Sequence, residues 1–162
     1  MKVLVTAASK HGSASEIASA IAARLRRSGL AVDSFAPESV QSLAEYDAVV
    51  IGSAVYMRQW MEAARDFVAR FHGQLRQMPT WAFSVGMSGV PKRAPQDPKK
   101  IGPVSMDGVF DHTKVFAGRY DPTRLSLRER SIARLAGAVE GDFRDWDEVE
   151  RWADSIAEAL KN

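Results

Sequence analysis

Short apolar runs alternate with amphipathic stretches along this chain, and this alternation restricts the fold more than any other feature. Runs rich in β-branched and apolar residues predict strands at residues 2–7, 30–35, 47–52, 81–85 and 114–118. Continuous apolar runs are typical of parallel strands that are buried on both faces and joined by helices. The sequence therefore predicts an α/β fold. We expect a doubly wound, five-stranded parallel sheet in the order 2-1-3-4-5, with helices on both faces.

Helices are predicted between these strands, and several have recognisable first residues. Ser13 and Glu16 fit a capping box, in which Ser13 is the N-cap and Glu16 follows three residues later. Ser126 and Glu129 repeat the pattern, and Asp145 caps the last helix. The predicted helical segments run from 13 to the C′ glycine at 29, over 39–45 and 60–75, from 126 onward and from 145 onward.

Composition narrows the possible functions. The chain has 162 residues, a formal net charge of +2 and no cysteine. The lack of cysteine excludes a disulfide scaffold, a Cys-ligated metal site and a thiol nucleophile, so redox chemistry would need a bound cofactor. The three histidines lack metal-ligand spacing and no groove-reading motif is present, so we expect neither a metal nor a nucleic acid.

Length and hydropathy give expectations about organisation. A chain of 162 residues is about the size of one domain, so we expect a single domain over 1–162. No apolar run approaches the ~20 residues of a membrane span, and the first residues lack a signal-peptide pattern. We therefore expect a cytoplasmic protein.

The predicted topology gives the place of a site before any ligand is considered. In an open parallel sheet, ligands bind beyond the carboxyl ends of the strands where the strand order reverses, here between the first and third strands. The loops at that point are 8–14, 53–60 and 86 onward. The first loop combines serines, Lys10 and a glycine with a helix N-terminus, which suits an anion such as phosphate. An ordinary strand–helix turn is the alternative, and Glu16 is a nearby negative charge that would oppose an anion.

The second loop offers aromatic side chains. Tyr56 and Trp60 could flank a flat heteroaromatic ring, with stacking worth about 0.5–1.5 kcal/mol for each pair. Trp60 also begins the apolar face of the next predicted helix, so we expect Trp60 in the core and Tyr56 facing a ligand.

Several common sites are excluded by their motifs. The dinucleotide fingerprint G-x-G-x-x-G and the phosphate loop G-x-x-x-x-G-K-[ST] are absent. A phospho-receiver needs carboxylates after the first and third strands, where this chain has residues 7–8 (AA) and 52–53 (GS). Residues 86–90 (GMSGV) fall short of the nucleophile elbow G-x-S-x-G, which argues against a serine hydrolase.

Six stretches of the sequence resemble a known family. They are residues 3–13 (VLVTAASKHGS), 46–54 (YDAVVIGSA), 64–68 (ARDFV), 79–85 (PTWAFSV), 117–118 (AG) and 145–147 (DWD). The first is similar to the FMN phosphate loop of flavodoxins. Together they resemble the bacterial quinone-dependent protoporphyrinogen dehydrogenases and their flavodoxin-domain relatives. The resemblance covers essentially the whole chain and implies a flavodoxin-like fold with FMN as the cofactor.

The resemblance also implies which residues contact FMN. The phosphate would be held by Ser9, Lys10, His11, Gly12, Ser13 and Ala14. The isoalloxazine ring would pass along Ser53, Ala54, Val55 and Tyr56, with Gly86, Met87 and Ser88 on its other side. Ala8 and Ala14 depart from the family, which usually has hydroxyl residues there. Two lost contacts would cost about 0.5–1.5 kcal/mol each, unless backbone N–H groups do most of the holding.

Two functions follow from the resemblance. In the first, an enzyme takes reducing equivalents from a small-molecule substrate, by analogy protoporphyrinogen IX, and passes them to a quinone. In the second, an electron-transfer flavodoxin acts between redox partners. No side chain has the pattern of a catalytic acid or base, because the flavin would carry the chemistry. Arg58 is the candidate for a charge that tunes the flavin.

Charge position favours the enzyme. A long Pro- and Gly-rich loop at about 86–113 carries four cations, and the following segment carries more. These residues are Lys92, Arg93, Lys99, Lys100, Arg119, Arg124, Arg128, Arg130 and Arg134. A basic rim would attract a porphyrinogen with propionate groups, or anionic lipid headgroups near a quinone pool. Peripheral contact with the inner face of an anionic membrane is thus left open, as is a set of ordinary solvated charges. The oligomeric state is not predicted.

Overall fold

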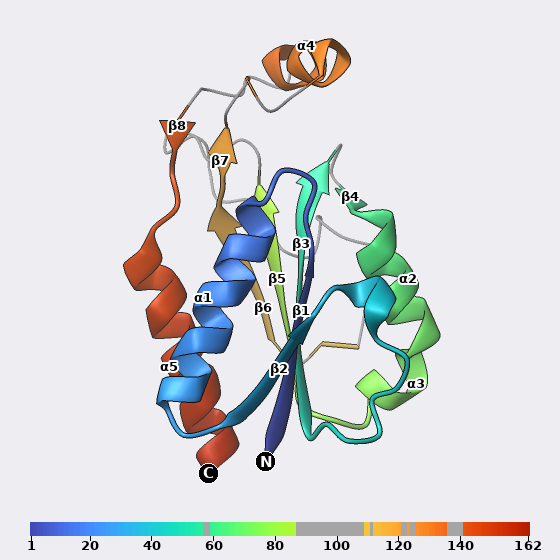
Figure 1. Ribbon diagram of the computed structural model, residues 1–162, viewed down its shortest axis with the longest axis vertical. Helices are drawn as coiled ribbons and strands as arrows, with labels where there is room; N and C mark the ends of the chain where they lie inside the picture. The colour runs from blue at the N-terminus through green and yellow to red at the C-terminus, as the bar shows by residue number, and fades with distance from the viewer. Residues whose placement is uncertain (57–58, 87–108, 111, 121–122, 124–125, 136–140) are drawn as a thin grey trace.

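The computed structural model describes residues 1–56, 59–86, 109–110, 112–120, 123, 126–135 and 141–162. Its centre is a twisted six-stranded sheet with helices on both faces (Figure 1). The strands are β1 (Lys2–Ala8), β2 (Ala31–Phe35), β3 (Ala48–Tyr56), β4 (Gln59–Trp60), β5 (Thr80–Gly86) and β6 (His112–Ala117). The path β2-β1-β3-β5-β6 is parallel throughout, and β4 adds a short antiparallel pairing to β3. The five parallel strands therefore have the predicted doubly wound order, and the flavodoxin-like α/β fold is confirmed.

Helices bury each face of the sheet. On one face lie α1 (Ser13–Arg27) and α5 (Trp146–Lys161). On the other lie α2 (Glu62–Arg70), α3 (His72–Leu75) and the 3-10 turn η1 (Pro37–Ser39). Successive side chains of a strand point to opposite faces, so Val3 and Val5 pack in the α1–α5 core while Leu4 packs in the α2 core. This two-sided burial explains the continuous apolar runs in the sequence.

Phe83 lies at the centre of the α1–α5 core. It is fully buried and makes edge-on contacts with Phe116 and Trp152, each with ring centroids 6.0 Å apart. Gly52, its neighbour on β3, leaves room for the ring, because a Cβ at Gly52 would lie 2.0 Å from Phe83 Cζ. The glycine that ends the predicted third strand is thus required by packing.

Two predicted helices differ from the structure. The helix predicted over 39–45 is wrong, because the 3-10 turn ends at Ser39 and Val40 is extended, at φ −81° and ψ 120°. The segment after it buries Val40, Leu43 and Tyr46 against the α2 core without forming a helix. The single helix predicted over 60–75 is also wrong. Trp60 belongs to β4, and Phe71, at φ −110° and ψ 16°, separates α2 from α3.

After β6 the chain leaves the sheet and returns beside it. The short strands β7 (Arg119–Tyr120) and β8 (Gly141–Asp142) pair antiparallel, with Arg119 opposite Asp142. We call this pair the β7–β8 neck. Between its strands lies α4 (Leu127–Leu135), which sits beyond the carboxyl ends of the strands (Figure 1).

The predicted N-caps of the last two helices are confirmed, but the Glu129 side chain contacts Lys10 and His11 and does not complete the capping box with Ser126. Ser126 Oγ accepts a hydrogen bond from the Glu129 N–H at 3.2 Å, and Asp145 Oδ1 accepts one from the Glu148 N–H at 3.1 Å. Both bonds satisfy amide groups that a helix start otherwise leaves without partners.

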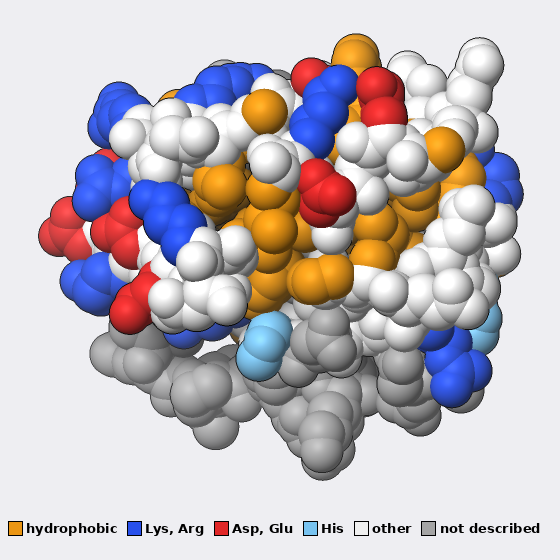
Figure 2. Space-filling view, turned by 90° about the horizontal axis from the view of Figure 1, so that it is seen from below, with side chains coloured by type: hydrophobic (Ala, Val, Ile, Leu, Met, Phe, Trp, Pro, Cys, Tyr) orange, Lys and Arg blue, Asp and Glu red, His pale blue; other side chains and the backbone are white. Residues whose placement is uncertain are grey.

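The two ends of the sheet differ in character. Seen from the amino ends of the strands, apolar side chains gather in the middle of the surface, and charged groups lie mainly toward its edges (Figure 2). The polar network described below lies at the opposite, carboxyl end. Within the described residues, no helix has the length and apolar character needed to cross a bilayer, and no cluster of His, Asp and Glu could hold a metal.

Candidate functional site

The carboxyl ends of the central strands lie side by side at one end of the sheet. Ala8 pairs with Ser53, Val55 with Gly86, and Gly86 with Ala117. This register brings the loop after β1, the end of β3 and the end of β5 together, as the strand order predicts. The candidate site is therefore built on adjacent parallel strands.

The turn between β1 and α1 is closed by glycine and serine. Gly12 is left-handed, at φ 89°, and its N–H donates to Ser9 Oγ at 3.0 Å. Helix α1 then begins at Ser13, and its first helical bond runs from the Glu16 N–H to the Gly12 carbonyl at 2.9 Å. The amides of the first turn have no acceptor within the helix, and together with the helix dipole they favour an anion.

The predicted capping box at Ser13 is wrong. The N-cap is Gly12, and no side chain caps the helix. A glycine can take the left-handed conformation at little cost, so the chain turns one residue earlier than the serine pattern suggests. Glu16 consequently does not fold back onto the start of its own helix.

Ala8 and Ala14 are both buried, and they pack into opposite cores. Ala8 is 5% exposed in the α2 core, and Ala14 is fully buried in the α1–α5 core. Their methyl groups thus serve packing on either side of the loop. At these two positions the chain can offer a ligand only backbone groups.

Two basic side chains of the loop contact a carboxylate from α4. Lys10 Nζ lies 3.2 Å from Glu129 Oε1, and His11 Nε2 lies 2.7 Å from Glu129 Oε2. Partial burial alone would raise the pKa of Glu129, but the hydrogen bonds from His11 and Lys10 outweigh it and lower that pKa below its ordinary value. Glu129 therefore binds α4 to the loop as an ionised carboxylate.

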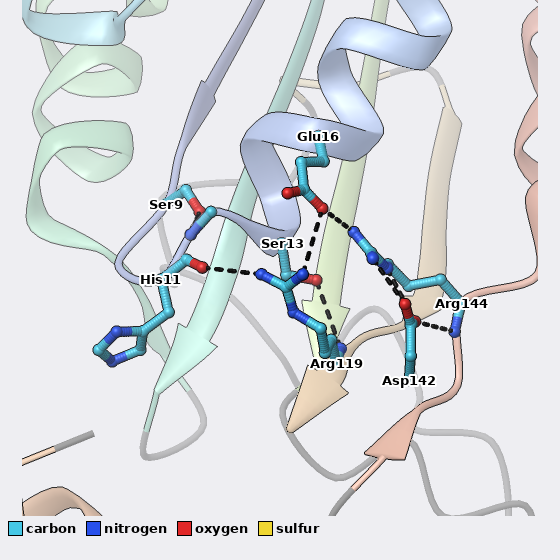
Figure 3. A network of polar contacts seen from close by, with 8 residues as sticks. Ser9, His11, Ser13, Glu16, Arg119, Asp142 and Arg144 are labelled. Carbon is cyan, nitrogen blue, oxygen red and sulfur yellow. Dashed lines mark hydrogen bonds and ion pairs between the residues drawn. The ribbon is translucent and has the colours of Figure 1, made fainter. Parts of the chain in front are cut away.

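Glu16 points away from the loop into a polar network (Figure 3). Its Oε2 forms an ion pair with Arg144 and lies 3.8 Å from Arg119 Nη1. Arg119 also reaches the loop itself. Its backbone N–H lies 3.4 Å from Ser13 Oγ, and its Nη2 donates to the His11 carbonyl at 3.3 Å.

Arg144 is the most buried charge of this network. Its side chain is 6% exposed and contacts both oxygens of Asp142, with Nε at 2.8 Å from Oδ1 and Nη2 at 2.6 Å from Oδ2. These hydrogen bonds lower the pKa of Asp142 to about 2, although burial opposes the shift. They and the contact with Glu16 also raise the pKa of Arg144. The four groups Glu16, Arg119, Asp142 and Arg144 thus carry two negative and two positive charges.

At the end of β3, one side chain stabilises the fold and two are available to a ligand. Ser53 is fully buried, donates to the Ala54 carbonyl at 2.8 Å and accepts from the Met61 N–H at 2.9 Å, so its hydroxyl holds β3 against the start of α2. Ala54 and Val55 are half-buried at the carboxyl end of β3. An apolar, partly exposed surface of this kind suits a flat ring.

Trp60 belongs to the core, as predicted. It is 2% exposed, and its indole N–H donates to Ser84 Oγ at 2.8 Å. Its ring lies 5.9 Å from that of Phe110, centroid to centroid. Trp60 therefore supports the end of β3 from within the core.

Part of the predicted site lies outside the described residues. These positions are Met87, Ser88, Arg58, the side chains of Tyr56 and Arg134, and the cations Lys92, Arg93, Lys99, Lys100 and Arg124. Their predicted roles, and that of the 86–113 loop, stay predictions. Gly86 is described, and it packs closely against Gly118, whose Cβ position lies 2.3 Å from the Gly86 carbonyl oxygen.

The sequence reasoning missed three residues that surround the loop. The sequence indicates Glu129 only as part of a helix cap and Arg119 only as part of a basic segment, and no pattern in it points to Arg144. A signal existed for the arginines, since Arg119 follows the 117–118 stretch and Arg144 precedes the 145–147 stretch that carry the family resemblance. The contact of Glu129 with the loop had no such signal.

Known proteins are similar to this chain in sequence and fold. A family model described as "Flavodoxin domain" matches residues 4–147. Protoporphyrinogen IX dehydrogenase [quinone] of Escherichia coli strain K12 is 26% identical over 172 residues, which cover 97% of this chain and 95% of the relative.

Two solved structures share the fold at 16% identity. A flavodoxin from the domain Archaea has a TM-score of 0.66, with 100% of both chains covered. Rubredoxin oxygen:oxidoreductase of Desulfovibrio gigas has a TM-score of 0.65, and the match covers 99% of this chain but 36% of that longer one. The chain belongs to the flavodoxin-domain family, whose cofactor is FMN.

Proposed function

We propose that the loop between β1 and α1 binds the phosphate of FMN and that the ends of β3 and β5 receive its ring. The observation that carries this proposal is the start of α1, where the left-handed Gly12 turns the chain so that first-turn amides lie at the loop. Serine hydroxyls, a lysine and unsatisfied amides are the donor set that a phosphate requires. The residues present therefore fit the cofactor of the family.

Each loop residue has a separate task in this proposal. The Ser9 hydroxyl accepts the Gly12 N–H, which keeps the turn closed, and its own proton can be donated to phosphate. Ser13 can donate in the same way while accepting from Arg119. Ala14 contributes its backbone N–H, and Lys10 adds a positive charge.

The ring would lie against a different kind of surface. Ala54 and Val55 would exclude water from one side of it, and Gly86 would let it approach the β5 backbone closely. When bound, FMN supplies hydride and electron transfer, which this cysteine-free chain cannot supply itself.

We further propose that the protein is an oxidoreductase for a small anionic substrate of the porphyrinogen class, with a quinone as acceptor. The 26% identical relative, named for protoporphyrinogen IX and quinone, supports this assignment over nearly the whole chain. The basic residues that follow one another in the sequence between 92 and 134 also support it, because propionate groups are attracted to positive charge.

Two experiments, carried out one after the other, test the proposal. The purified protein is first titrated with FMN by flavin fluorescence, where saturable quenching is expected. Ser13→Ala should weaken binding several-fold, and Ser155→Ala, on the exposed face of α5, should leave it unchanged. The absence of saturable quenching in the wild-type protein would exclude the FMN site.

The FMN-loaded protein is then mixed anaerobically with protoporphyrinogen, and a menaquinone analogue is added. Bleaching of the flavin absorbance by the first and its recovery with the second are expected. Failure of the porphyrinogen to bleach the flavin, with rapid exchange of electrons with a redox protein instead, would support the alternative function of an electron-transfer flavodoxin.

Peripheral membrane contact belongs to the same proposal, because quinones reside in the bilayer. Leu127 is 79% exposed in the first turn of α4, beside the exposed Arg128, so an apolar and a basic group are presented together. Co-sedimentation with phosphatidylglycerol vesicles is expected, and Leu127→Ser should reduce it. Equal recovery with neutral phosphatidylcholine vesicles would contradict the contact.

A further inference from the structure

A negatively charged side chain lies within one helical turn of the proposed phosphate site. Glu16 is in the first turn of α1, the helix whose N-terminus would face the phosphate. An acidic residue there stabilises the helix through its dipole, but it also repels an anion bound at the same end. The loop would therefore bind a phosphate poorly unless this charge were compensated.

The compensation comes from two arginines on a distant part of the chain. Arg144 forms an ion pair with Glu16 Oε2, and Arg119 Nη1 lies 3.8 Å from the same oxygen (Figure 3). Arg144 is 6% exposed, so water screens it little, and Asp142 holds its guanidinium at two atoms. The position of the positive charge beside Glu16 is thus fixed before any ligand binds.

Arg119 adds a second effect by holding the loop itself. It donates to the His11 carbonyl at 3.3 Å, and its backbone N–H faces Ser13 Oγ at 3.4 Å. Both contacts restrain the loop, and α4 restrains it further through the contact of Glu129 with Lys10. The carbonyl of His11 is thereby turned toward Arg119, where it cannot oppose an anion at the amides.

We infer that Arg144 and Arg119 are positioning residues that make the β1–α1 loop selective for a phosphate-bearing flavin over a flavin without phosphate. The inference rests on the proposed FMN site. Both arginines act through Glu16 and the loop backbone, because neither is needed as a direct ligand of the phosphate. Their effect should therefore depend on the charge of Glu16 and on the charge of the ligand.

A set of four variants tests this inference: Arg144→Gln, Arg144→Lys, Glu16→Gln, and Glu16→Gln combined with Arg144→Gln. Dissociation constants are measured for FMN and for riboflavin, which has the same ring but no phosphate. Arg144→Gln should weaken FMN binding about tenfold and riboflavin binding less than twofold. Arg144→Lys should fall between the wild-type protein and Arg144→Gln, because it keeps the charge but loses the two-atom contact with Asp142.

Removing the charge of Glu16 should restore FMN binding to the Arg144→Gln variant. Glu16→Gln alone should tighten FMN a few-fold, and the double variant should recover to within about threefold of the wild-type protein. In 0.5 M salt the FMN deficit of Arg144→Gln should shrink, while riboflavin affinity stays constant. A role limited to stability would move neither the ratio of FMN to riboflavin affinity nor its salt dependence.

Three results would overturn the inference. They are an equal loss of FMN and riboflavin affinity in Arg144→Gln, no recovery in the double variant, and no tightening of FMN by Glu16→Gln. The last is decisive if Arg144→Gln fails to fold, because Glu16→Gln keeps Arg144 on Asp142. Failure of the wild-type protein to bind FMN would instead refute the proposed function, and the wild-type titration separates the two cases.

Discussion

At the scale of single residues, close packing decides what this chain tolerates. Gly118 and Gly86 bring two strand ends into contact, and Gly52 lies under the Phe83 ring. Thr6 is the opposite case, because its buried hydroxyl has no hydrogen-bond partner among the described residues. These positions predict stability changes of opposite sign.

Gly118→Ala should lower the free energy of unfolding by about 2 kcal/mol, because the added Cβ would lie 2.3 Å from the Gly86 carbonyl oxygen and the backbone would have to move. Gly73→Ala is the matched control. Nothing lies within 4 Å of its Cβ position, and alanine in a helix should raise stability by up to about 1 kcal/mol. Urea unfolding measures both, and equal stability of the two variants would contradict the packing argument.

Thr6→Val should raise the free energy of unfolding by about 1 kcal/mol, because it replaces an unpartnered buried hydroxyl with a methyl group of similar size. Thr80→Val provides the contrast. Thr80 Oγ1 donates to the Val109 carbonyl at 2.9 Å, so losing it should destabilise by about 1–2 kcal/mol. Thermal unfolding of both variants is the measurement, and destabilisation by Thr6→Val would show that the hydroxyl has a partner after all.

At the scale of elements, α4 is attached to the candidate site through Glu129. This carboxylate holds both Lys10 and His11. An FMN phosphate at the loop would be a second anion near these two side chains, so Glu129 and the cofactor would compete for them.

Glu129→Gln should therefore strengthen FMN binding about three- to tenfold and leave riboflavin binding unchanged, because it removes a negative charge beside the loop. Isothermal titration of both flavins is the measurement. Glu158→Gln, an exposed position on α5, serves as the control. Weaker FMN binding in Glu129→Gln would indicate that Glu129 supports the loop and does not compete with the phosphate.

The elements that the sequence predicts well are those with a local physical cause. Buried parallel strands need continuous apolar runs, and the caps at Ser126 and Asp145 are formed within four residues. The helix expected over 39–45 fails because burial of Val40 and Tyr46 outweighs local propensity. The cap at Ser13 fails because Gly12 turns the chain first.

The candidate site also has one part that the sequence predicts and one part that it does not. The predicted sheet order is correct about which strand ends are adjacent, because topology alone determines where they meet. The contact between His11 and Glu129 joins residues 118 positions apart, and no local pattern encodes it. The ion pair between Glu16 and Arg144 is equally non-local. The sequence therefore shows the negative charge of Glu16 near the loop, but not the arginine that neutralises it.

At the scale of the whole molecule, the two ends of the sheet differ. The amino end of the sheet has an apolar centre (Figure 2), and the network of Glu16, Arg119, Asp142 and Arg144 lies at the carboxyl end (Figure 3). Asp142 and Arg119 face each other across the β7–β8 neck, so the network also ties this neck to α1.

The stability contribution of Asp142 should disappear in acid. Its pKa is lowered to about 2, from the ordinary 3.8, by hydrogen bonds from Arg144. A lowered pKa gives stability that is complete above the unfolded value, near 4, and is lost as pH falls toward 2. The difference in unfolding free energy between the wild-type protein and Asp142→Asn should thus be constant from pH 7 to about 5 and shrink below pH 4. A difference that persists to pH 2 would contradict the assigned ion pair.

The β7–β8 neck has a consequence for how this domain can vary. Arg119 and Asp142 are paired neighbours, so the chain between Tyr120 and Gly141 departs and re-enters at one point. The entropy of closing a loop grows only as the logarithm of its length, about 0.6 kcal/mol for each doubling. Residues 121–140 can therefore be lengthened, shortened or exchanged at small thermodynamic cost to the sheet. The neck therefore separates variation in the length of this segment from the stability of the sheet.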